Sequence, residues 1–325
     1  IRAWVNTGMN GGGIPIVANI YEAVGFALGA ERRSYTIGLF KKFEAAKKDL
    51  AAGRGLPLEV LEGIRSSFHP DVPADSLLEL TKHTMTAGQR MATQRRAAEA
   101  GVEVDFDPTQ YDPVKLYLYA FEMGMTEEIA HALGQKAAKA ALAFPFEYEV
   151  VGILVDCSAS MYGDETQKLR PIATALAVRD LLMRTADVAR IRHAGGEPDD
   201  RGLVLPSQDT ELATSLVQLL EMRPDVVYVI SDGYENAPAG RFAEVMAHLK
   251  RIGIKTPVYH LNPVMAAESA GVRELAPGLA PTMPVHDPSG LGISFLRGVL
   301  EAEPLRGINT LLKLAVKPDK KEALT

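Results

Sequence analysis

The sequence predicts an α/β domain with a doubly wound, mostly parallel sheet, preceded by an all-α helical domain. From residue 14 to about 145, apolar residues recur at helical spacing between glycine and proline breaks. After Pro145, short apolar strands alternate with amphipathic helices, which implies parallel pairing with right-handed crossovers. We therefore expect a helical domain over 1–145, an α/β domain over 146–303 and a C-terminal tail over 304–325.

The helices of the first half are predicted from their start and stop signals. YTIGLFKKFEAAKKDLAAG carries an apolar stripe that Gly53 closes, and LPLEVLEGIRSSFHP follows it. The longest predicted run is DSLLELTKHTMTAGQRMATQRRAAEAG, with Asp75 as its cap. Asp112 before Pro113, and Thr126 before two glutamates, predict the starts of two further helices.

The second half is predicted as a regular alternation. Residues 151–155 are mostly apolar, as in a strand buried on both faces inside a parallel sheet. We expect strands over 149–155, near 188–193, over 226–231, and in PVYHLN and TMPVHD. We expect helices over 169–184, 211–222 and 240–252, and in GISFLRGVLEA.

Composition restricts the class of protein. The chain has 325 residues, 47% of them hydrophobic, and a net charge of −6, so nucleic-acid binding would require a local basic patch. Its single cysteine, Cys157, excludes internal disulfides and is typical of a reducing compartment, so we expect a cytoplasmic protein. The most apolar long stretch is too short to span a bilayer, and no signal peptide is visible. The chain begins at Ile1 without Met, as expected of a truncated helical domain.

Three oxygen-bearing side chains follow the strand at 149–155. Asp156, Ser158 and Ser160 are each two residues apart, a spacing that can bring them to one side of an extended turn. Ligands of open α/β sheets bind beyond the carboxyl ends of the strands. One carboxylate with two hydroxyls suits a hard cation such as Mg²⁺, although other divalent cations also fit.

This D-x-S-x-S pattern resembles the metal-ion-dependent adhesion site (MIDAS) of von Willebrand factor A (vWA) domains. The resemblance implies a threonine from a second loop and an aspartate from a third, and Thr210 and Asp232 fill these positions. Asp209 departs from the family, which usually has glycine there. The implied metal site is Asp156, Ser158, Ser160, Thr210 and Asp232.

The arrangement of a helical half before such a domain resembles the Ro ribonucleoprotein autoantigen (TROVE) family. The junction TEEIAHALGQKAAKAALAF–EYEVVGILVDCSASM carries the likeness, together with SDGYENAPAGRFAEVMAHLKRIGIKTPVYHL. The helical half is much shorter than the ring of that family. The resemblance implies an RNA-binding protein of non-coding RNA quality control, with structured non-coding RNA as its partner and Mg²⁺ in the vWA domain.

A basic stretch in the helical half is the candidate RNA contact. Between Glu79 and Glu99 there is no acidic residue, and phosphate binding requires such a local cluster. The alternative interpretation is a solvated basic helix face, and the sequence does not decide between them. The candidate residues are Lys82, His83, Arg90, Arg95 and Arg96.

Three functions compete. The first is a non-enzymatic, Mg²⁺-dependent binding protein that carries RNA and recruits a protein partner whose Glu or Asp completes the metal shell. The second is a vWA interaction subunit of an AAA ATPase or chelatase-type assembly, without RNA. The third is a haloacid-dehalogenase-like phosphatase with Asp156 as nucleophile, which Ser158 disfavours because it cannot replace the general-acid aspartate of those enzymes.

Overall fold

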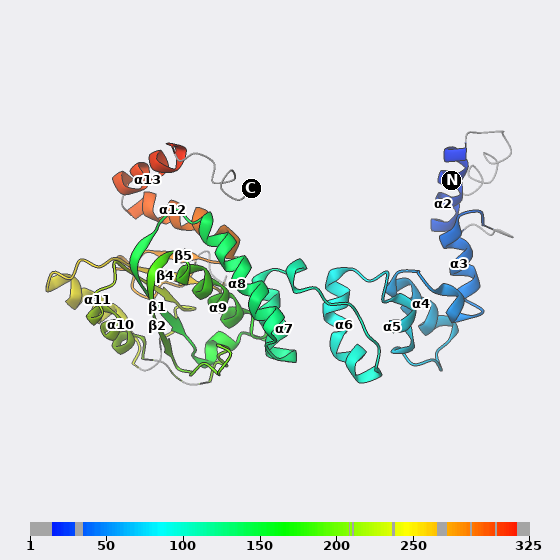
Figure 1. Cartoon of the computed structure of the whole chain (residues 1–325), viewed down its shortest axis with the longest axis horizontal. Coiled ribbons are helices and arrows are strands. Elements are labelled where there is room, and N and C mark those ends of the chain that lie inside the picture. Colours follow the sequence, from blue (N-terminus) through cyan, green and yellow to red (C-terminus); the bar gives the residue numbers. More distant parts are fainter. Residues whose placement is uncertain are drawn as a thin grey trace. The chain divides into compact units, whose positions relative to one another are not determined.

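A computed structural model gives the fold of two compact units, Ile1–Asp107 and Pro108–Thr325. Figure 1 shows the elements of each unit in sequence colours. The structure describes residues 15–29, 35–207, 209, 211–235, 238–264, 272–286, 288–302 and 304–316.

In the described residues of the first unit, all regular secondary structure is helical. Its core contains Leu50, Leu56, Leu61, Ile64 and Leu77, all buried. Gly53 lies directly against Leu61, where a Cβ atom would come within 2.5 Å of a leucine methyl carbon. The elements are α2 (Pro15–Ala27), α3 (Gly38–Ala46), the 3₁₀ turn η2 (Leu50–Gly53), α4 (Leu58–Phe68), α5 (Ser76–Thr81) and α6 (Ala87–Ala100).

The single long helix predicted after Asp75 is two helices, α5 and α6. Asp75 makes no capping hydrogen bond to α5. A capping box instead starts α6: the Thr86 hydroxyl accepts from the Gln89 amide at 3.3 Å, and the Gln89 side chain accepts from the Thr86 amide at 2.8 Å. Because this capping box starts a new helix at residue 87, the structure has two helices where the apolar spacing alone predicted one continuous helix.

The second unit contains a five-stranded, all-parallel sheet in the order β2-β1-β3-β4-β5, which confirms the predicted α/β class. The strands are β1 (Tyr148–Asp156), β2 (Ala186–Ala194), β3 (Val226–Ile230), β4 (Val258–Asn262) and β5 (Thr282–Pro284). The other elements are the turns η3 (Pro108–Gln110), η4 (Ala159–Tyr162) and η5 (Pro288–Gly290), and the helices α7 (Pro113–Met123), α8 (Glu127–Leu142), α9 (Arg170–Met183), α10 (Leu212–Glu221), α11 (Arg241–Arg251), α12 (Leu291–Ala302) and α13 (Pro304–Val316).

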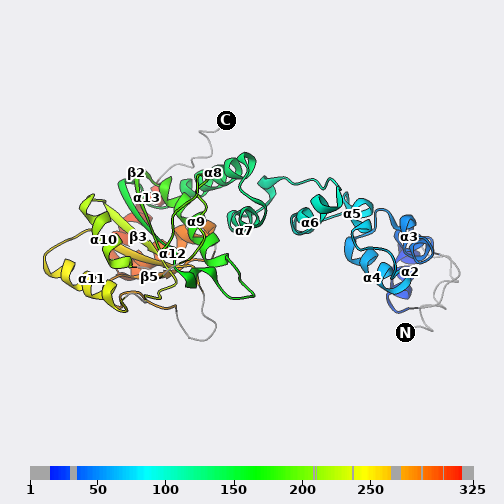
Figure 2. The ribbon, with the colours of Figure 1, turned by 90° about the horizontal axis from the view of Figure 1, so that it is seen from below.

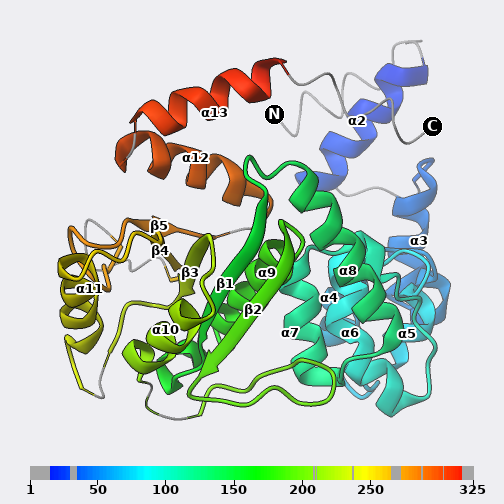
Figure 3. The same ribbon diagram turned by 60° about the vertical axis from the view of Figure 1, so that its left-hand side comes forward.

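Helices cover both faces of this sheet. On one face, Leu216 of α10 and Phe242 of α11 pack in one cluster with Leu154 of β1 and with Val227 and Val229 of β3. On the other face, α9 packs on β1 and β2, and α12 places Phe295 against Tyr228 and Tyr259. Figures 2 and 3 show these layers from two further directions. The central strands are therefore buried on both sides, as their apolar sequences require.

Helices α7 and α8 belong to the α/β unit, so the compact units divide at 107/108 rather than near the expected boundary at 145. Both helices pack on α9. Tyr117 of α7 is buried and donates its hydroxyl to Asp180 of α9, and the Arg179 guanidinium donates to the same hydroxyl at 3.3 Å. The predicted caps of these helices are confirmed, since Asp112 and Thr126 accept from Lys115 and Ile129 amides.

The end of the chain forms a helix in its described part. The tail expected from residue 304 begins with α13, which packs on α12 through Gly307 and leaves Leu305 and Leu312 exposed. Residues 317–325 lie outside the described part of the chain. Among the helices that the structure describes, none is long and apolar enough to cross a membrane.

Candidate metal centre

The sheet order places the candidate site at a topological switch point. From β1 the chain crosses to β2 on one side and then returns to β3 on the other. Ligands of open parallel sheets bind in the crevice at such a point, beyond the carboxyl ends of the two strands. Asp156 ends β1, and Asp232 follows β3 by two residues.

Asp156 is fully buried, and each of its carboxylate oxygens accepts a hydrogen bond. Oδ1 accepts from the Ser158 amide at 2.9 Å. Oδ2 accepts from the Ser231 hydroxyl at 2.7 Å. These two bonds fix the orientation of the carboxylate at the end of β1.

The two predicted serines lie together in the turn that follows Asp156. The hydroxyl oxygens of Ser158 and Ser160 are 2.9 Å apart. Ser158 is the residue before η4, so the chain turns immediately and returns Ser160 to the same side. The spacing in the sequence therefore brings three oxygen-bearing side chains to one place, as predicted.

Asp232 enters this cluster from the neighbouring strand. The Ser160 side chain lies near enough to the Asp232 carboxyl to lower its pKa, and Asp232 Oδ1 accepts from the Tyr234 amide at 3.0 Å. The residue is 4% exposed. The site thus combines two buried carboxylates and two hydroxyls from two loops.

Burial raises the pKa of both carboxyls. The pKa of Asp156 rises to about 6, because the loss of solvent outweighs the hydrogen bonds from Ser231 and Ser158, and the nearby Asp232 charge adds to the rise. Burial also raises the pKa of Asp232, against hydrogen bonds and the charge of Arg273. Two carboxyls buried near enough to interact electrostatically are a favourable environment for a cation.

Thr210, the fifth predicted residue, lies outside the described residues. The segment that leads to it is described up to Ser207, whose amide donates to the Cys157 carbonyl at 3.2 Å. Asp209 is exposed. Cys157 is fully buried, and burial raises the pKa of its thiol to about 12, which suits an inert core residue.

Sequence reasoning missed residues that support this cluster. Val155 of β1 is in register with Ile230 of β3, so Ser231 falls opposite Asp156 and bonds to it. Asn262, at the end of β4, donates to the Asp232 carbonyl at 3.0 Å and is buried. Ser231 could have been found from its place at a strand end beside Asp232, whereas Asn262 required the strand order.

The candidate site differs from a site built on acids and histidines. Among the residues that the structure describes, no group of three or more His, Cys, Asp or Glu side chains is placed to hold a metal ion. The cluster at Asp156 contains only two carboxylates, and hydroxyls supply its other oxygens. Hard divalent cations accept such a mixed oxygen set.

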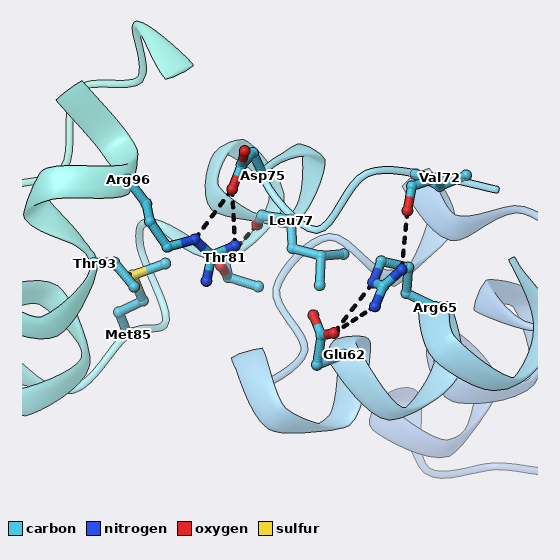
Figure 4. A network of polar contacts seen from close by, with 9 residues as sticks. All are labelled: Glu62, Arg65, Val72, Asp75, Leu77, Thr81, Met85, Thr93 and Arg96. Carbon is cyan, nitrogen blue, oxygen red and sulfur yellow. Dashed lines mark hydrogen bonds and ion pairs between the residues drawn. The ribbon is translucent and has the colours of Figure 1, made fainter. Parts of the chain in front are cut away.

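The candidate RNA residues do not form a free basic patch, because acidic neighbours pair with four of them. Arg96 donates through two nitrogens to Asp75, at 3.1 and 2.8 Å (Figure 4). Glu79 pairs with Lys82 at 2.9 Å, Asp105 with Arg90 at 3.0 Å, and Glu99 with Arg95 at 3.2 Å. His83 is exposed.

The helix geometry also separates these arginines. Arg90 and Arg95 are five residues apart on α6, which turns them about 140° from each other, and Arg96 lies a further 100° or so around. The side chains of Arg95 and Arg96 remain 66% and 47% exposed. The acid-free stretch of sequence is therefore a set of surface ion pairs that point in different directions.

Comparisons with known proteins leave the family open. No family model and no curated protein matches the sequence. Among solved structures, the chain is similar to the crystal structure of the Ro (RSR) protein of Deinococcus radiodurans, with a TM-score of 0.33 and 12% identity. The match covers 91% of this chain and 73% of that one. A likeness of this strength carries no conclusion about what this chain binds.

Proposed function

We propose that the α/β unit is a metal-dependent binding module that holds Mg²⁺ or a similar divalent cation. The observation that supports it most strongly is the convergence of Asp156, Ser158, Ser160 and Asp232 at the β1/β3 switch point. Hydroxyl and carboxylate oxygens are the ligands that Mg²⁺ accepts, and the cation would compensate the buried acids. Thr210, which the resemblance to vWA domains implies, is the proposed fifth residue.

The role of the cation would be to attract an anionic oxygen from outside. Ser158 and Ser160 are neutral, so direct contacts from them leave most of the cation's charge uncompensated. Asp156 and Asp232 would then act through waters or through hydrogen bonds to the hydroxyls. A carboxylate is a better ligand for a hard cation than water. We therefore propose that a Glu or Asp of a partner protein completes the shell.

The environment of Asp156 favours binding over catalysis. A nucleophilic carboxylate must reach its substrate, whereas Asp156 is 0% exposed and both its oxygens accept hydrogen bonds. Ser158 holds the place where the phosphatases carry their general acid. We propose no enzymatic activity for the chain, and metal-dependent release of phosphate from a generic phosphate ester would contradict this.

The test of the metal site is Asp156→Ala, measured by titration calorimetry with Mg²⁺. We expect the variant to lose Mg²⁺ binding and any metal-dependent partner, while wild type and Asp187→Ala keep both. Asp187 is an exposed carboxylate at the start of β2 and serves as the control. Normal Mg²⁺ binding by Asp156→Ala would show that the site is wrongly assigned.

We also propose that the helical unit binds structured RNA through the exposed arginines of α6. The pairs of Arg95 with Glu99 and of Arg96 with Asp75 are largely solvent-exposed. Exposed ion pairs contribute only about 0–1 kcal/mol, so a phosphate can displace the carboxylate at little cost. The geometry favours separate contacts rather than one continuous patch.

The RNA proposal is tested with the double variant Arg95→Gln/Arg96→Gln. If both contact phosphates, affinity falls for all sequences, and the slope of log affinity against log salt decreases by about 1.5 to 2. The control is Lys41→Gln/Lys48→Gln, two exposed lysines of α3 and the turn after it. If the two double variants have the same salt slope, the arginines of α6 belong to a solvated helix face and do not contact RNA phosphates. Co-purification of an ATPase without RNA would favour the assembly-subunit alternative.

A further inference from the structure

Arg273 lies close to the candidate metal centre. The Arg273 guanidinium lies over the Tyr234 ring, 3.2 Å from its centroid, and the Tyr234 amide donates to Asp232. The charge of Arg273 also acts on the Asp232 carboxyl and lowers its pKa, although burial prevails. A fixed positive charge is therefore within electrostatic reach of a proposed metal ligand.

The backbone holds this arginine in place. The buried Asn262 side chain donates to the Asp232 carbonyl at 3.0 Å and to the Arg273 carbonyl at 3.1 Å. Gly233 has a φ of +80°, and a Cβ atom there would come within 2.9 Å of Arg273. Because one side chain joins both carbonyls and the glycine permits close approach, Arg273 is anchored to the loop that carries Asp232.

The guanidinium has an open side. Among the residues that the structure describes, none forms an ion pair with Arg273, and its contact is the Tyr234 ring. A cation in the neighbouring site would place a second positive charge near Arg273, and Asp232 is a carboxyl on which the Arg273 charge acts. An anion from outside would be attracted by both charges at once.

From this arrangement we infer that the ligand of the metal centre is an acidic peptide segment with two carboxylates. One carboxylate completes the cation's shell, and the second forms a two-pronged pair with Arg273, whose planar fork matches a carboxylate. This inference rests on the proposed metal-dependent function. A nucleobase is disfavoured because the guanidinium already covers one face of Tyr234, an exposed aromatic two residues after Asp232.

The experiment measures two affinities for each variant of the full chain, by titration calorimetry at low salt. The first is for Mg²⁺ alone, and the second is for hexaglutamate with saturating Mg²⁺. In Arg273→Ala we expect Mg²⁺ affinity to be unchanged or higher, since a like charge is removed. We expect hexaglutamate affinity to fall about tenfold or more, as for loss of a hydrogen-bonded charge pair.

Controls separate the possible failures. Arg251→Ala, at the far end of α11, should behave as wild type, and Arg273→Lys should retain part of the hexaglutamate affinity. Hexaglutamate binding that is absent, or that is equal in Arg273→Ala and wild type, overturns the inference while Mg²⁺ binding stands. A uridine hexamer that binds in an Arg273-dependent way, where hexaglutamate does not, also overturns it. Absence of Mg²⁺ binding by wild type instead refutes the metal centre itself.

Discussion

Replacing Asp156 with asparagine should stabilise the metal-free α/β unit at neutral pH. The pKa of this carboxyl rises from its ordinary value of 3.8 to about 6 in the fold. Each pKa unit corresponds to about 1.4 kcal/mol, so keeping the ionised carboxylate buried costs about 3 kcal/mol above pH 6. Asparagine removes that charge at nearly the same volume.

The hydrogen bonds of the site reduce the gain. The asparagine oxygen can still accept from the Ser158 amide, but the Ser231 hydroxyl loses the acceptor it has in Asp156. Losing one such hydrogen bond costs about 1 kcal/mol. We therefore expect a net increase of about 2 kcal/mol in the free energy of unfolding at pH 7.5.

The sign of the pH dependence follows from the raised pKa. Below pH 3.8, Asp156 is protonated in both states and carries no penalty, and the penalty grows between pH 3.8 and about 6 as the unfolded state alone ionises. At pH 4.5 the penalty in wild type is about 1 kcal/mol, so the advantage of Asp156→Asn should nearly vanish.

The assay is native-state amide hydrogen exchange of β1 and β3 in the presence of EDTA, at pH 7.5 and pH 4.5. This reports the α/β unit separately from the helical unit. Added Mg²⁺ should then increase protection in wild type only. The prediction is wrong if β1 and β3 are less protected in Asp156→Asn than in wild type at pH 7.5. It is also wrong if the difference in protection between the two proteins is the same at both pH values.

Three further predictions concern the same unit. Mg²⁺ affinity should fall about tenfold between pH 7 and pH 5, because the ion must displace a proton from Asp156 with its pKa of about 6; calorimetry that finds no change contradicts this. Asp180→Ala should lower the free energy of unfolding by about 3–5 kcal/mol, because it leaves the buried Arg179 charge unpaired; urea denaturation with a loss under 1 kcal/mol opposes it. Phe295→Ala should lower the free energy of unfolding by about 3–5 kcal/mol, because it leaves a cavity beside Tyr228 and Tyr259. An unchanged thermal unfolding midpoint would show that the packing of α12 on the sheet contributes little to stability.

The α/β half could be predicted closely because its signals are local. Short strands alternating with amphipathic helices predicted the elements from β1 to α12, although α13 was expected only as a tail. The D-x-S-x-S spacing predicted that Asp156, Ser158 and Ser160 lie together. The approach of Asp232 was expected only through the family resemblance, and strand pairing explains it. Val155 and Ile230 are in register, which sets the residues after both strands side by side.

What the sequence could not show depends on contacts between distant residues. Amphipathic spacing identifies α7 and α8 as helices, but the partner of their apolar faces is decided by contacts such as Tyr117 with Asp180. The ion pairs of the basic stretch were hidden for the same reason, since Asp75 and Asp105 lie outside it and pair with Arg96 and Arg90 in the fold. Linear charge spacing does not reveal such pairs.

The most direct test of the metal centre is anomalous scattering from crystals of the full chain grown with Mn²⁺ in place of Mg²⁺. We predict one peak beside the hydroxyls of Ser158 and Ser160, close to Asp156 and Asp232, and no such peak in crystals of Asp156→Ala. Electron density for the protein with no anomalous peak between β1 and β3, at Mn²⁺ concentrations that occupy other sites, would contradict a cation site at this switch point.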